Sequence, residues 1–182
     1  MNLVKTNIDG LVVLNPKIFN DRRGSFTESY NKKNINKLLG NISFVQDNES
    51  ESFRGVLRGL HFQKPPYAQS KLVHCVKGTV LDVALDIRKN SKTYGKFEST
   101  ILSDDNKNQL FIPKGFAHGF VVLSESAILS YKVDNYYNWE SESGIIWNDP
   151  YLKIDWKLNK NDIIISEKDS KLSSFNNFLS PF

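Results

Sequence analysis

Short stretches in which hydrophobic and polar residues alternate dominate the chain. The clearest is residues 78–88, where four aliphatic side chains alternate with Asp82 and Asp86. This period of two is the pattern of a β-strand, whose successive side chains point to opposite faces. Similar segments, rich in β-branched and aromatic residues, predict strands over residues 11–19, 25–30, 42–48, 54–64, 71–76, 97–103, 109–113, 116–124 and 127–133.

Turn-forming clusters separate these segments, as in residues 21–24 (DRRG), 104–108 (DDNKN) and 113–115 (PKG). Short strands at this spacing are typical of an all-β sandwich or barrel. The sequence Val-Lys-Gly at 76–78 also predicts a turn, which would join the strands on either side of it into a hairpin.

Residues 32–40 (KKNINKLLG) predict the one clear helix inside the chain. Ile35, Leu38 and Leu39 would share one face of this helix. Gly40 is placed to end it, because glycine is the usual residue just past a helix C-terminus.

The C-terminal segment, residues 160–182, has a mixed pattern, and we expect it to wrap around the barrel. Its aromatic residues Phe175, Phe178 and Phe182 are expected to pack into a surface groove. The chain contains no internal repeat, low-complexity region or linker. Residues 1–182 are therefore expected to form a single domain.

The composition is that of a globular protein, with 182 residues, 40% hydrophobic and 24% charged. No run of about 18 apolar residues occurs, so we expect no membrane-spanning helix. Residues 1–15 lack the features of a secretory signal. The single cysteine, Cys75, allows no internal disulfide and fits a reducing cytoplasm. The net charge is only +4 and the lysines are scattered, so we expect no nucleic-acid binding.

A metal site needs ligands that converge, commonly with two histidines in one short motif. His61, His74 and His118 are far apart, and no HxH or HExxH motif occurs. His74 and Cys75 are neighbours, which strand alternation would point to opposite faces. We therefore expect no metal site. The GxSxG motif of serine nucleophiles and the glycine-rich loops that bind phosphates or dinucleotides are also absent.

What remains is a set of isolated acid–base residues: His61, Lys71, His118, Tyr131 and the pair 168–169. Each has a purely structural interpretation, such as a histidine bonded to a backbone carbonyl or a tyrosine with its hydroxyl at a rim. His118 alternates with Phe116 and Phe120, so it would point among aromatic rings. Spacing alone does not join these residues into one site.

Five blocks of sequence, in order, carry a resemblance to a known family: FVQDNES…GVLRGLHFQ (44–63), QSKLVHCVKGTVLDVALDIR (69–88), SDDNKNQLFIPKGFAHGFVVLS (103–124), YKVDNYY…ESESGIIWNDP (131–150) and IDW (154–156). From about residue 10 to residue 170 the chain resembles the dTDP-4-dehydrorhamnose 3,5-epimerase family. The resemblance implies a cupin-type jelly-roll barrel, no cofactor and a homodimer, to which we expect the N-terminal strands to contribute. It further implies epimerisation at C3 and C5 of a dTDP-linked 4-keto-6-deoxyhexose, on the route to rhamnose for surface polysaccharide.

The resemblance also implies roles for individual residues. His61 is the base, and Asp169 orients it. Lys71 faces the ketone of the sugar, and Tyr131 is the acid. Phe26 and Tyr137 are our candidates for stacking on the nucleobase of the substrate. For Phe26, packing within the protein is an alternative. Contacts to the nucleotide and its phosphates are implied for Arg23, Glu28, Gln46, Asn48, Arg58, His118, Glu142 and Lys168.

These roles fit the chemistry of the reaction. Epimerisation beside a ketone removes a C–H proton, forms an enolate and returns a proton from the other face. A neutral imidazole with a carboxylate partner suits the first step near pH 7. A cation at the ketone oxygen stabilises the enolate, and a phenol can return the proton.

Arg23 and Arg58 each offer a planar fork of donors to phosphate oxygens. Arg58 and His61 are three residues apart, so in a regular strand they would face opposite ways. If both line one pocket, we expect Gly59 to permit a bulge that resets the alternation. Otherwise one of the two serves the ligand from the end of the strand.

The chain departs from the family pattern at a few positions. Trp139 stands where members usually have proline, and Glu49 and Glu51 stand where many have histidine and a neutral or basic residue. Trp139 could reshape the lid over the sugar, so the exact substrate stays open. Three other functions also stay open: a single-carbon epimerase on a related 4-keto sugar nucleotide, a nucleotide-sugar-binding cupin without activity, and a metal-dependent cupin oxygenase.

Overall fold

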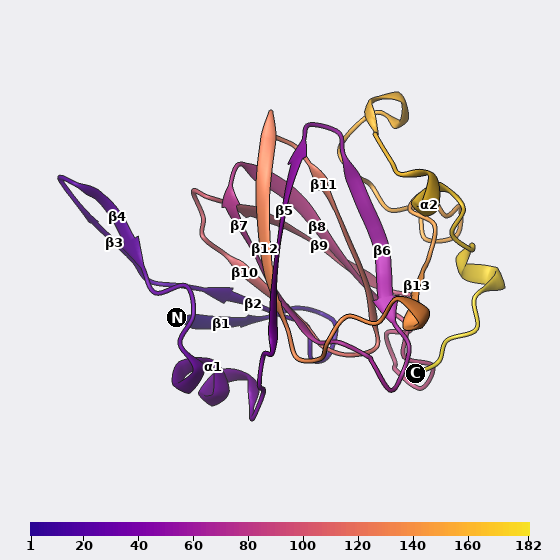
Figure 1. Ribbon diagram of the computed structural model, residues 1–182, viewed down its shortest axis with the longest axis horizontal. Coiled ribbons are helices and arrows are strands. Elements are labelled where there is room, and N and C mark those ends of the chain that lie inside the picture. The colour runs from indigo at the N-terminus through magenta and orange to yellow at the C-terminus, as the bar shows by residue number, and fades with distance from the viewer.

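In a computed structural model that describes residues 1–182, two antiparallel sheets face each other as a barrel (Figure 1). The expected all-β fold is confirmed. The six-stranded sheet runs in the order β1 (Asn2–Lys5), β2 (Val12–Asn15), β10 (Gln109–Ile112), β7 (Lys71–Lys77), β12 (Ser126–Val133) and β5 (Gln46–Phe53). The five-stranded sheet runs in the order β13 (Glu142–Gly144), β6 (Leu57–Gln63), β11 (Phe116–Val122), β8 (Thr79–Asp86) and β9 (Phe97–Ser103).

A cluster of 14 buried residues fills part of the space between the two sheets. Val73 and Leu129 come from the six-stranded sheet, and Ala84 and Phe120 come from the five-stranded sheet. Tyr131 is half-buried and packs against this cluster. The hydrophobic interior therefore adjoins the side chain of the candidate acid.

A second cluster covers the other face of the five-stranded sheet. The aliphatic residues of the alternating segment share this face, as predicted, and belong to the cluster: Leu81, Val83, Leu85 and Ile87. Trp156 and Phe175 from the C-terminal part of the chain belong to it too, and Phe182 packs against it. Because β8 is covered on both faces, Asp82 and Asp86 are fully buried.

Helix α1 (Lys32–Leu39) lies over the outer face of the six-stranded sheet, where Ile35 is fully buried beside Leu72. The side chain of Asn31 caps its N-terminus, and Gly40, with φ of +82°, ends it. The predicted helix is confirmed.

Four shorter helices follow in the last third of the chain: η1 (Trp139–Ser141), η2 (Lys160–Asp162), α2 (Glu167–Ser170) and η3 (Phe175–Asn177). None of the helices is long and apolar enough to cross a membrane.

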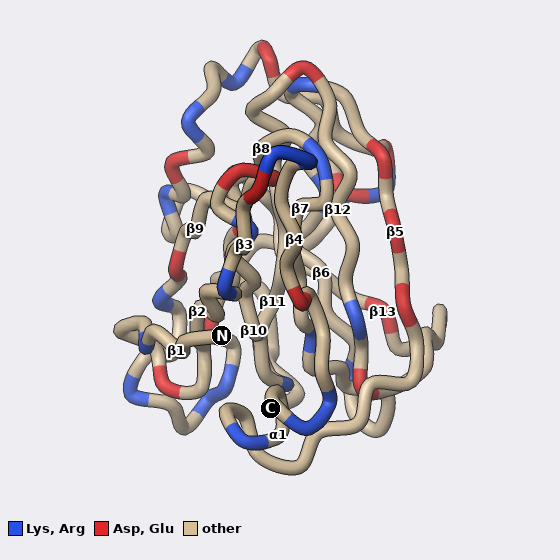
Figure 2. Tube along the Cα trace, turned by 90° about the vertical axis from the view of Figure 1, so that its left-hand side faces the viewer, with Lys and Arg blue, Asp and Glu red and all other residues tan.

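Strands β3 (Ile18–Asp21) and β4 (Gly24–Thr27) form a hairpin that projects away from the barrel (Figure 1). We call residues 18–27 the arm. In Figure 2 the arm points towards the viewer, and charged residues mark its tip. The predicted turn at residues 21–24 forms this tip.

The predicted hairpin around residues 76–78 is wrong. Strand β7 pairs with β10 and β12, whereas β8 pairs with β11 and β9, so the chain changes sheets at this turn. Only Gly78 separates the two strands, and the commonest hairpin turns need two residues between paired strands. Gly78 has φ of +80°, and a Cβ there would lie 2.1 Å from the carbonyl oxygen of Ser126. The sequence Val-Lys-Gly does form a turn, but this turn connects the two sheets and does not join neighbouring strands of one sheet.

The strand expected at 11–19 is instead two strands, β2 and β3, which lie in different sheets. Other strand predictions differ from the structure at their ends. The strand expected at 42–48 begins at Gln46 and runs on to Phe53, and the one expected at 25–30 stops at Thr27. Strand β13 was not predicted. The segments 97–103, 109–113, 116–124 and 127–133 contain strands, as expected.

Candidate active site

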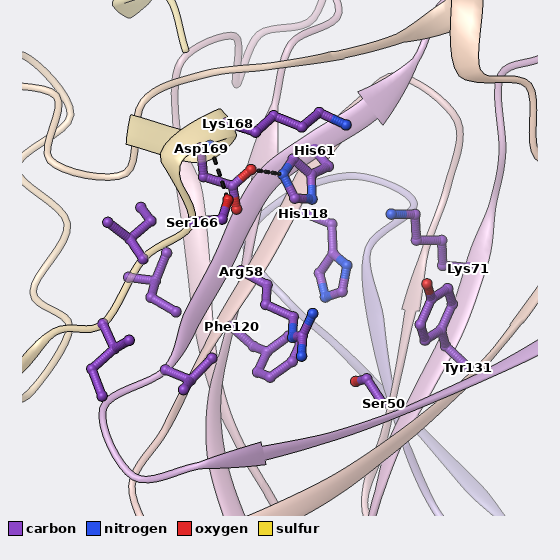
Figure 3. A pocket seen from close by; sticks show the side chains of 14 residues that line it. Ser50, Arg58, His61, Lys71, His118, Phe120, Tyr131, Ser166, Lys168 and Asp169 are labelled. Carbon is purple, nitrogen blue, oxygen red and sulfur yellow. Dashed lines mark hydrogen bonds and ion pairs between the residues drawn. The ribbon is translucent and has the colours of Figure 1, made fainter. Parts of the chain in front are cut away.

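A cavity of about 500 Å³ opens between the two sheets (Figure 3). Strands β6 and β11 form one wall, β5, β7 and β12 supply residues opposite, and residues 164–169 close a third side. Its lining residues are Ser50, Val56, Leu57, Arg58, His61, Lys71, His118, Phe120, Tyr131, Ile164, Ile165, Ser166, Lys168 and Asp169. A smaller cavity of about 220 Å³ shares His61, Lys71 and Tyr131 with it, so the two form adjoining lobes.

His61 and Asp169 form a hydrogen-bonded pair, although 108 residues separate them in the sequence. His61 Nε2 lies 2.7 Å from Asp169 Oδ1, and the other carboxylate oxygen accepts a hydrogen bond from the Gly59 amide at 3.2 Å. Burial raises the pKa of Asp169, but the hydrogen bonds from His61 and Gly59 outweigh it and leave the pKa below its usual value. Ser166 caps helix α2 by accepting from the Asp169 amide, which fixes the carboxylate in place. Asp169 thus stays ionised and holds Nε2–H of the imidazole, leaving Nδ1 free to accept a proton.

A second pair of the same kind lies on the neighbouring strand. His118 Nε2 contacts both carboxylate oxygens of Asp82, at 2.9 and 3.0 Å. His118 stands directly opposite His61 in the pairing of β6 with β11. Burial lowers the pKa of His118, and the nearby Asp82 offsets this only in part. Asp82 was missed from the sequence as a site residue, where the only signal was its place on a strand between hydrophobic neighbours.

Lys71 and Tyr131 face these histidines from the six-stranded sheet (Figure 3). Burial lowers the pKa of Lys71 to about 8, although the carboxylates of Asp82 and Glu142 act against the shift. Lys71 Nζ lies 5.9 Å from the centre of the Tyr131 ring. Burial raises the pKa of Tyr131, so its phenol carries a proton at neutral pH.

Arg58 and His61 both line the larger cavity, as the bulge hypothesis requires. The pairing of β6 with β11 shifts register between His118 and Phe120, opposite Gly59. Gly59 has φ of +128°, and a Cβ there would lie 2.5 Å from the Gly119 Cα atom. The predicted irregularity at Gly59 is therefore confirmed.

The smaller lobe is lined by residues expected to contact the nucleotide. The amide of Tyr137 donates to Gln46 Oε1, and Gln46 Nε2 donates to Asn48 Oδ1. The Tyr137 hydroxyl and Lys168 Nζ both contact Glu142 Oε2, each at 2.7 Å. Burial raises the pKa of Glu142, but Lys168 and Tyr137 outweigh it and keep the pKa below its usual value. These side chains form a connected polar rim.

Three of the expected binding residues do not reach either lobe in the single chain. Arg23 and Phe26 lie on the arm, where Arg23 pairs with Asp21 and Phe26 is 69% exposed. Glu28 follows the arm and accepts hydrogen bonds from side chains at the start of α1.

The residues that depart from the family pattern also lie outside both lobes. Trp139 is 73% exposed on η1. Glu49 and Glu51 are exposed on β5, where acidic residues follow the strand (Figure 2). They alternate with Ser50 and Ser52, whose side chains face the barrel interior. None of the three therefore lines either lobe beside His61, Lys71 and Tyr131.

Several residues that line the larger cavity were also missed from the sequence. Ser50 sits in a polar strand with no hydrophobic alternation to assign its face. Ile164, Ile165 and Ser166 come from a segment without a regular pattern. No group of three or more His, Cys, Asp or Glu side chains is arranged to hold a metal ion.

The comparisons with protein families, individual proteins and solved structures all point to the same family. The family model described as dTDP-4-dehydrorhamnose 3,5-epimerase matches residues 5–177. The Escherichia coli (strain K12) enzyme of that name is 53% identical over 173 residues, covering 94% of this chain and 93% of its own. The crystal structure of the enzyme of that name from Elizabethkingia anophelis superposes with a TM-score of 0.93 at 52% identity, covering 97% of both chains.

A second solved structure is a complex. The dTDP-6-deoxy-D-glucose-3,5-epimerase of Legionella pneumophila, with dTDP-4-keto-L-rhamnose bound, has a TM-score of 0.93 and 48% identity. The similarity covers 97% of this chain and 93% of the other. The expected jelly-roll fold of the cupin type is thereby confirmed.

Proposed function

This chain belongs to the dTDP-4-dehydrorhamnose 3,5-epimerase family, and from that premise we propose how its residues invert C3 and C5 of dTDP-4-dehydro-6-deoxy-D-glucose. The product is dTDP-4-dehydro-L-rhamnose. One observation carries the proposal: a histidine–aspartate pair, a lysine and a protonated tyrosine line the same cavity. The reaction requires a base, a cation and an acid, and these groups supply them.

His61 is the proposed base. Its Nε2–H is held by the ionised Asp169, so Nδ1 takes the proton from the carbon beside the ketone. The electron pair of that C–H bond forms a C=C bond to the carbonyl carbon, and the π pair of the ketone moves to its oxygen, which gives an enolate. Asp169 stabilises the imidazolium that forms, and its own low pKa keeps it from taking the proton.

Lys71 is proposed to stabilise the enolate oxygen. Its buried ammonium faces the base, and one well-placed donor in such a site contributes about 3–4 kcal/mol. His118 is a second donor or acceptor for the sugar in the same wall. Tyr131 Oη then delivers a proton to the opposite face of the ring, and the phenolate regains a proton from solvent.

The nucleotide is proposed to extend along the polar rim. Arg58 and Lys168 supply cations for the phosphates, while Gln46 and Asn48 supply amide groups. Tyr137 is 56% exposed and lines the smaller lobe, where its ring can stack on the nucleobase.

We further propose a homodimer in which the arm of one subunit completes the site of the other. The arm projects from the barrel with Phe19 and Phe26 exposed, 51% and 69% respectively (Figure 1). In this arrangement Arg23, Phe26 and Glu28 come to the substrate from the second copy. Burial of the two phenylalanines would then favour the dimer.

A cytoplasmic location is part of the proposal, supported by the single free Cys75. Membrane and nucleic acid are not among the proposed partners.

Conversion of the substrate in heavy water, followed by proton NMR, tests the function. We expect deuterium at both C3 and C5 with inversion at both carbons, with no added metal or cofactor. Exchange and inversion at a single carbon would instead identify a mono-epimerase. Binding without turnover would leave a nucleotide-sugar-binding protein.

A further inference from the structure

Ser50 carries a hydroxyl that has no partner inside the protein. Its Oγ is buried and makes no hydrogen bond, although Ser50 lines the larger cavity. A buried hydroxyl without a partner destabilises a folded protein, because it loses its hydrogen bonds to water and gains none in exchange. Buried polar groups in native proteins usually have a hydrogen-bond partner, and a bound ligand would provide one for Ser50.

The surroundings of Ser50 indicate which ligand group would complete it. Ser52, two residues further on the same face of β5, accepts a hydrogen bond from Arg58 Nε at 3.1 Å. Arg58 Nη2 reaches the carbonyl oxygen of Glu51 at 3.4 Å, so the guanidinium is anchored along this strand. Figure 3 shows the Arg58 guanidinium and the Ser50 hydroxyl directed towards the same part of the cavity.

The charge of Arg58 indicates which kind of ligand group lies beside Ser50. Arg58 makes no ion pair with any carboxylate, although it lines the cavity. An unpaired guanidinium beside a free hydroxyl donor is a site for an anion, and a phosphate oxygen accepts from both. A sugar hydroxyl would satisfy Ser50 but leave the Arg58 charge unmatched.

We propose that the Ser50 hydroxyl donates a hydrogen bond to a phosphate oxygen of the nucleoside diphosphate, next to Arg58. This inference rests on the proposed function, because it names a further contact in the same site. The contact exists in the substrate complex and in the transition state alike. Ser50 therefore contributes to binding and leaves the proton-transfer step to other residues.

The test is calorimetric titration of dTDP, which carries the phosphates without the sugar, into wild-type protein and the Ser50→Ala variant. We expect about tenfold weaker binding by the variant, the effect of one hydrogen bond to a charged acceptor. Turnover should show a higher KM with kcat nearly unchanged. Ser50→Thr keeps the hydroxyl on a strand residue and should recover most of the affinity.

Thermal unfolding separates ligand binding from a structural role, because loss of a structural hydroxyl would lower the Tm of the protein without ligand. Without ligand, the Tm of Ser50→Ala should be equal to or above that of the wild type, since the lost hydroxyl had no partner. With dTDP, the variant should gain less in Tm than the wild type. Ser130→Ala on the neighbouring strand β12 is the matched control, because Ser130 pairs with Glu49 and does not line the cavity.

Equal dTDP affinity of wild type and Ser50→Ala would overturn the inference, as would a fall in kcat without a change in dTDP binding. Failure of the wild type to bind dTDP would instead overturn the proposed function itself. The two failures are thus distinguishable.

Discussion

His61 and His118 face each other across adjacent strands, yet their settings differ in access to water. The His61 side chain is 29% exposed, whereas that of His118 is 7% exposed and its partner Asp82 is fully buried. A catalytic base must exchange its proton with solvent between turnovers. This access favours His61 as the base and leaves His118 to bind the substrate.

Replacing the base should remove both steps that depend on it. We expect His61→Asn to lower the epimerisation rate and the solvent exchange of the substrate by about 10²–10⁴-fold. Initial rates by NMR in heavy water measure both. His118→Asn is the matched control and should retain measurable exchange at the substrate carbons. Near wild-type exchange by His61→Asn would show that another group abstracts the proton.

Asp82 is expected to shape the pH dependence through Lys71. The carboxylates of Asp82 and Glu142 oppose the effect of burial, which alone would take the Lys71 pKa below about 8. Removing the Asp82 charge should therefore lower the Lys71 pKa further. The active ammonium form is then lost at a lower pH, so the alkaline limb of kcat should move to lower pH in Asp82→Asn.

The measurement is kcat against pH for wild type and Asp82→Asn. His61, His118 and Tyr131 also face Lys71, so Glu142→Gln serves as a second variant that should move the same limb in the same direction. An alkaline limb that stays at the wild-type pH in both variants would show that Lys71 does not set it.

The sequence allowed the candidate residues to be named, but not their partners. Asp82 stood on the polar side of an alternating segment, which usually faces water. In the folded chain this side faces the barrel interior, so the carboxylate is buried against His118. Which face of a strand is inside depends on the second sheet. A one-dimensional pattern does not contain that information.

At the scale of elements, the geometry of β6 depends on one glycine. Gly59 lets Arg58 and His61 line the same cavity, with φ of +128° and the backbone of Gly119 in contact. We expect Gly59→Ala to lower the free energy of unfolding by about 2–4 kcal/mol, from backbone strain and the clash together. Urea denaturation monitored by tryptophan fluorescence measures the change.

Gly24 in the arm provides the control for that substitution. Its φ is +124°, but nothing lies within 4 Å of the position a Cβ would take. Gly24→Ala should therefore cost only the strain, about 1 kcal/mol. Equal losses in the two variants would mean that the contact with Gly119 is not restrictive.

Strand prediction succeeded where hydrophobic, β-branched and aromatic residues are frequent, and it was incomplete along the polar strand β5. The segment 97–103 coincides with β9, and 116–124 contains β11. Strand β5 is polar along most of its length, because one face contributes to the two lobes of the cavity and the other faces outside. The hairpin error at Gly78 has another cause: a tight turn looks the same in sequence whether it stays in one sheet or crosses to the other.

At the scale of the whole molecule, the arm is the part that the single chain leaves without a function. If the arm completes the site of a second copy, a subunit with a defective cavity and a subunit with a defective arm should together form one intact site. We expect a mixed dimer of His61→Asn with an Arg23→Ala, Phe26→Ala double variant to show about half the activity of the wild-type dimer, since one of its two sites is then intact. Co-expression with two affinity tags isolates this dimer. Activity no greater than in either parent would show that the arm does not reach the partner's site.

The most direct measurement compares deuterium wash-in with inversion in the Tyr131→Phe variant, by proton NMR of the dTDP-4-keto sugar in heavy water. The proposed mechanism has the base and the acid on opposite faces of the ring, with Asp169 hydrogen-bonded to His61 and not to Tyr131. It predicts that this variant still exchanges ring protons through His61 while inversion falls by about 10² or more. Inversion at the wild-type rate, or equal and complete loss of exchange and inversion, would contradict it.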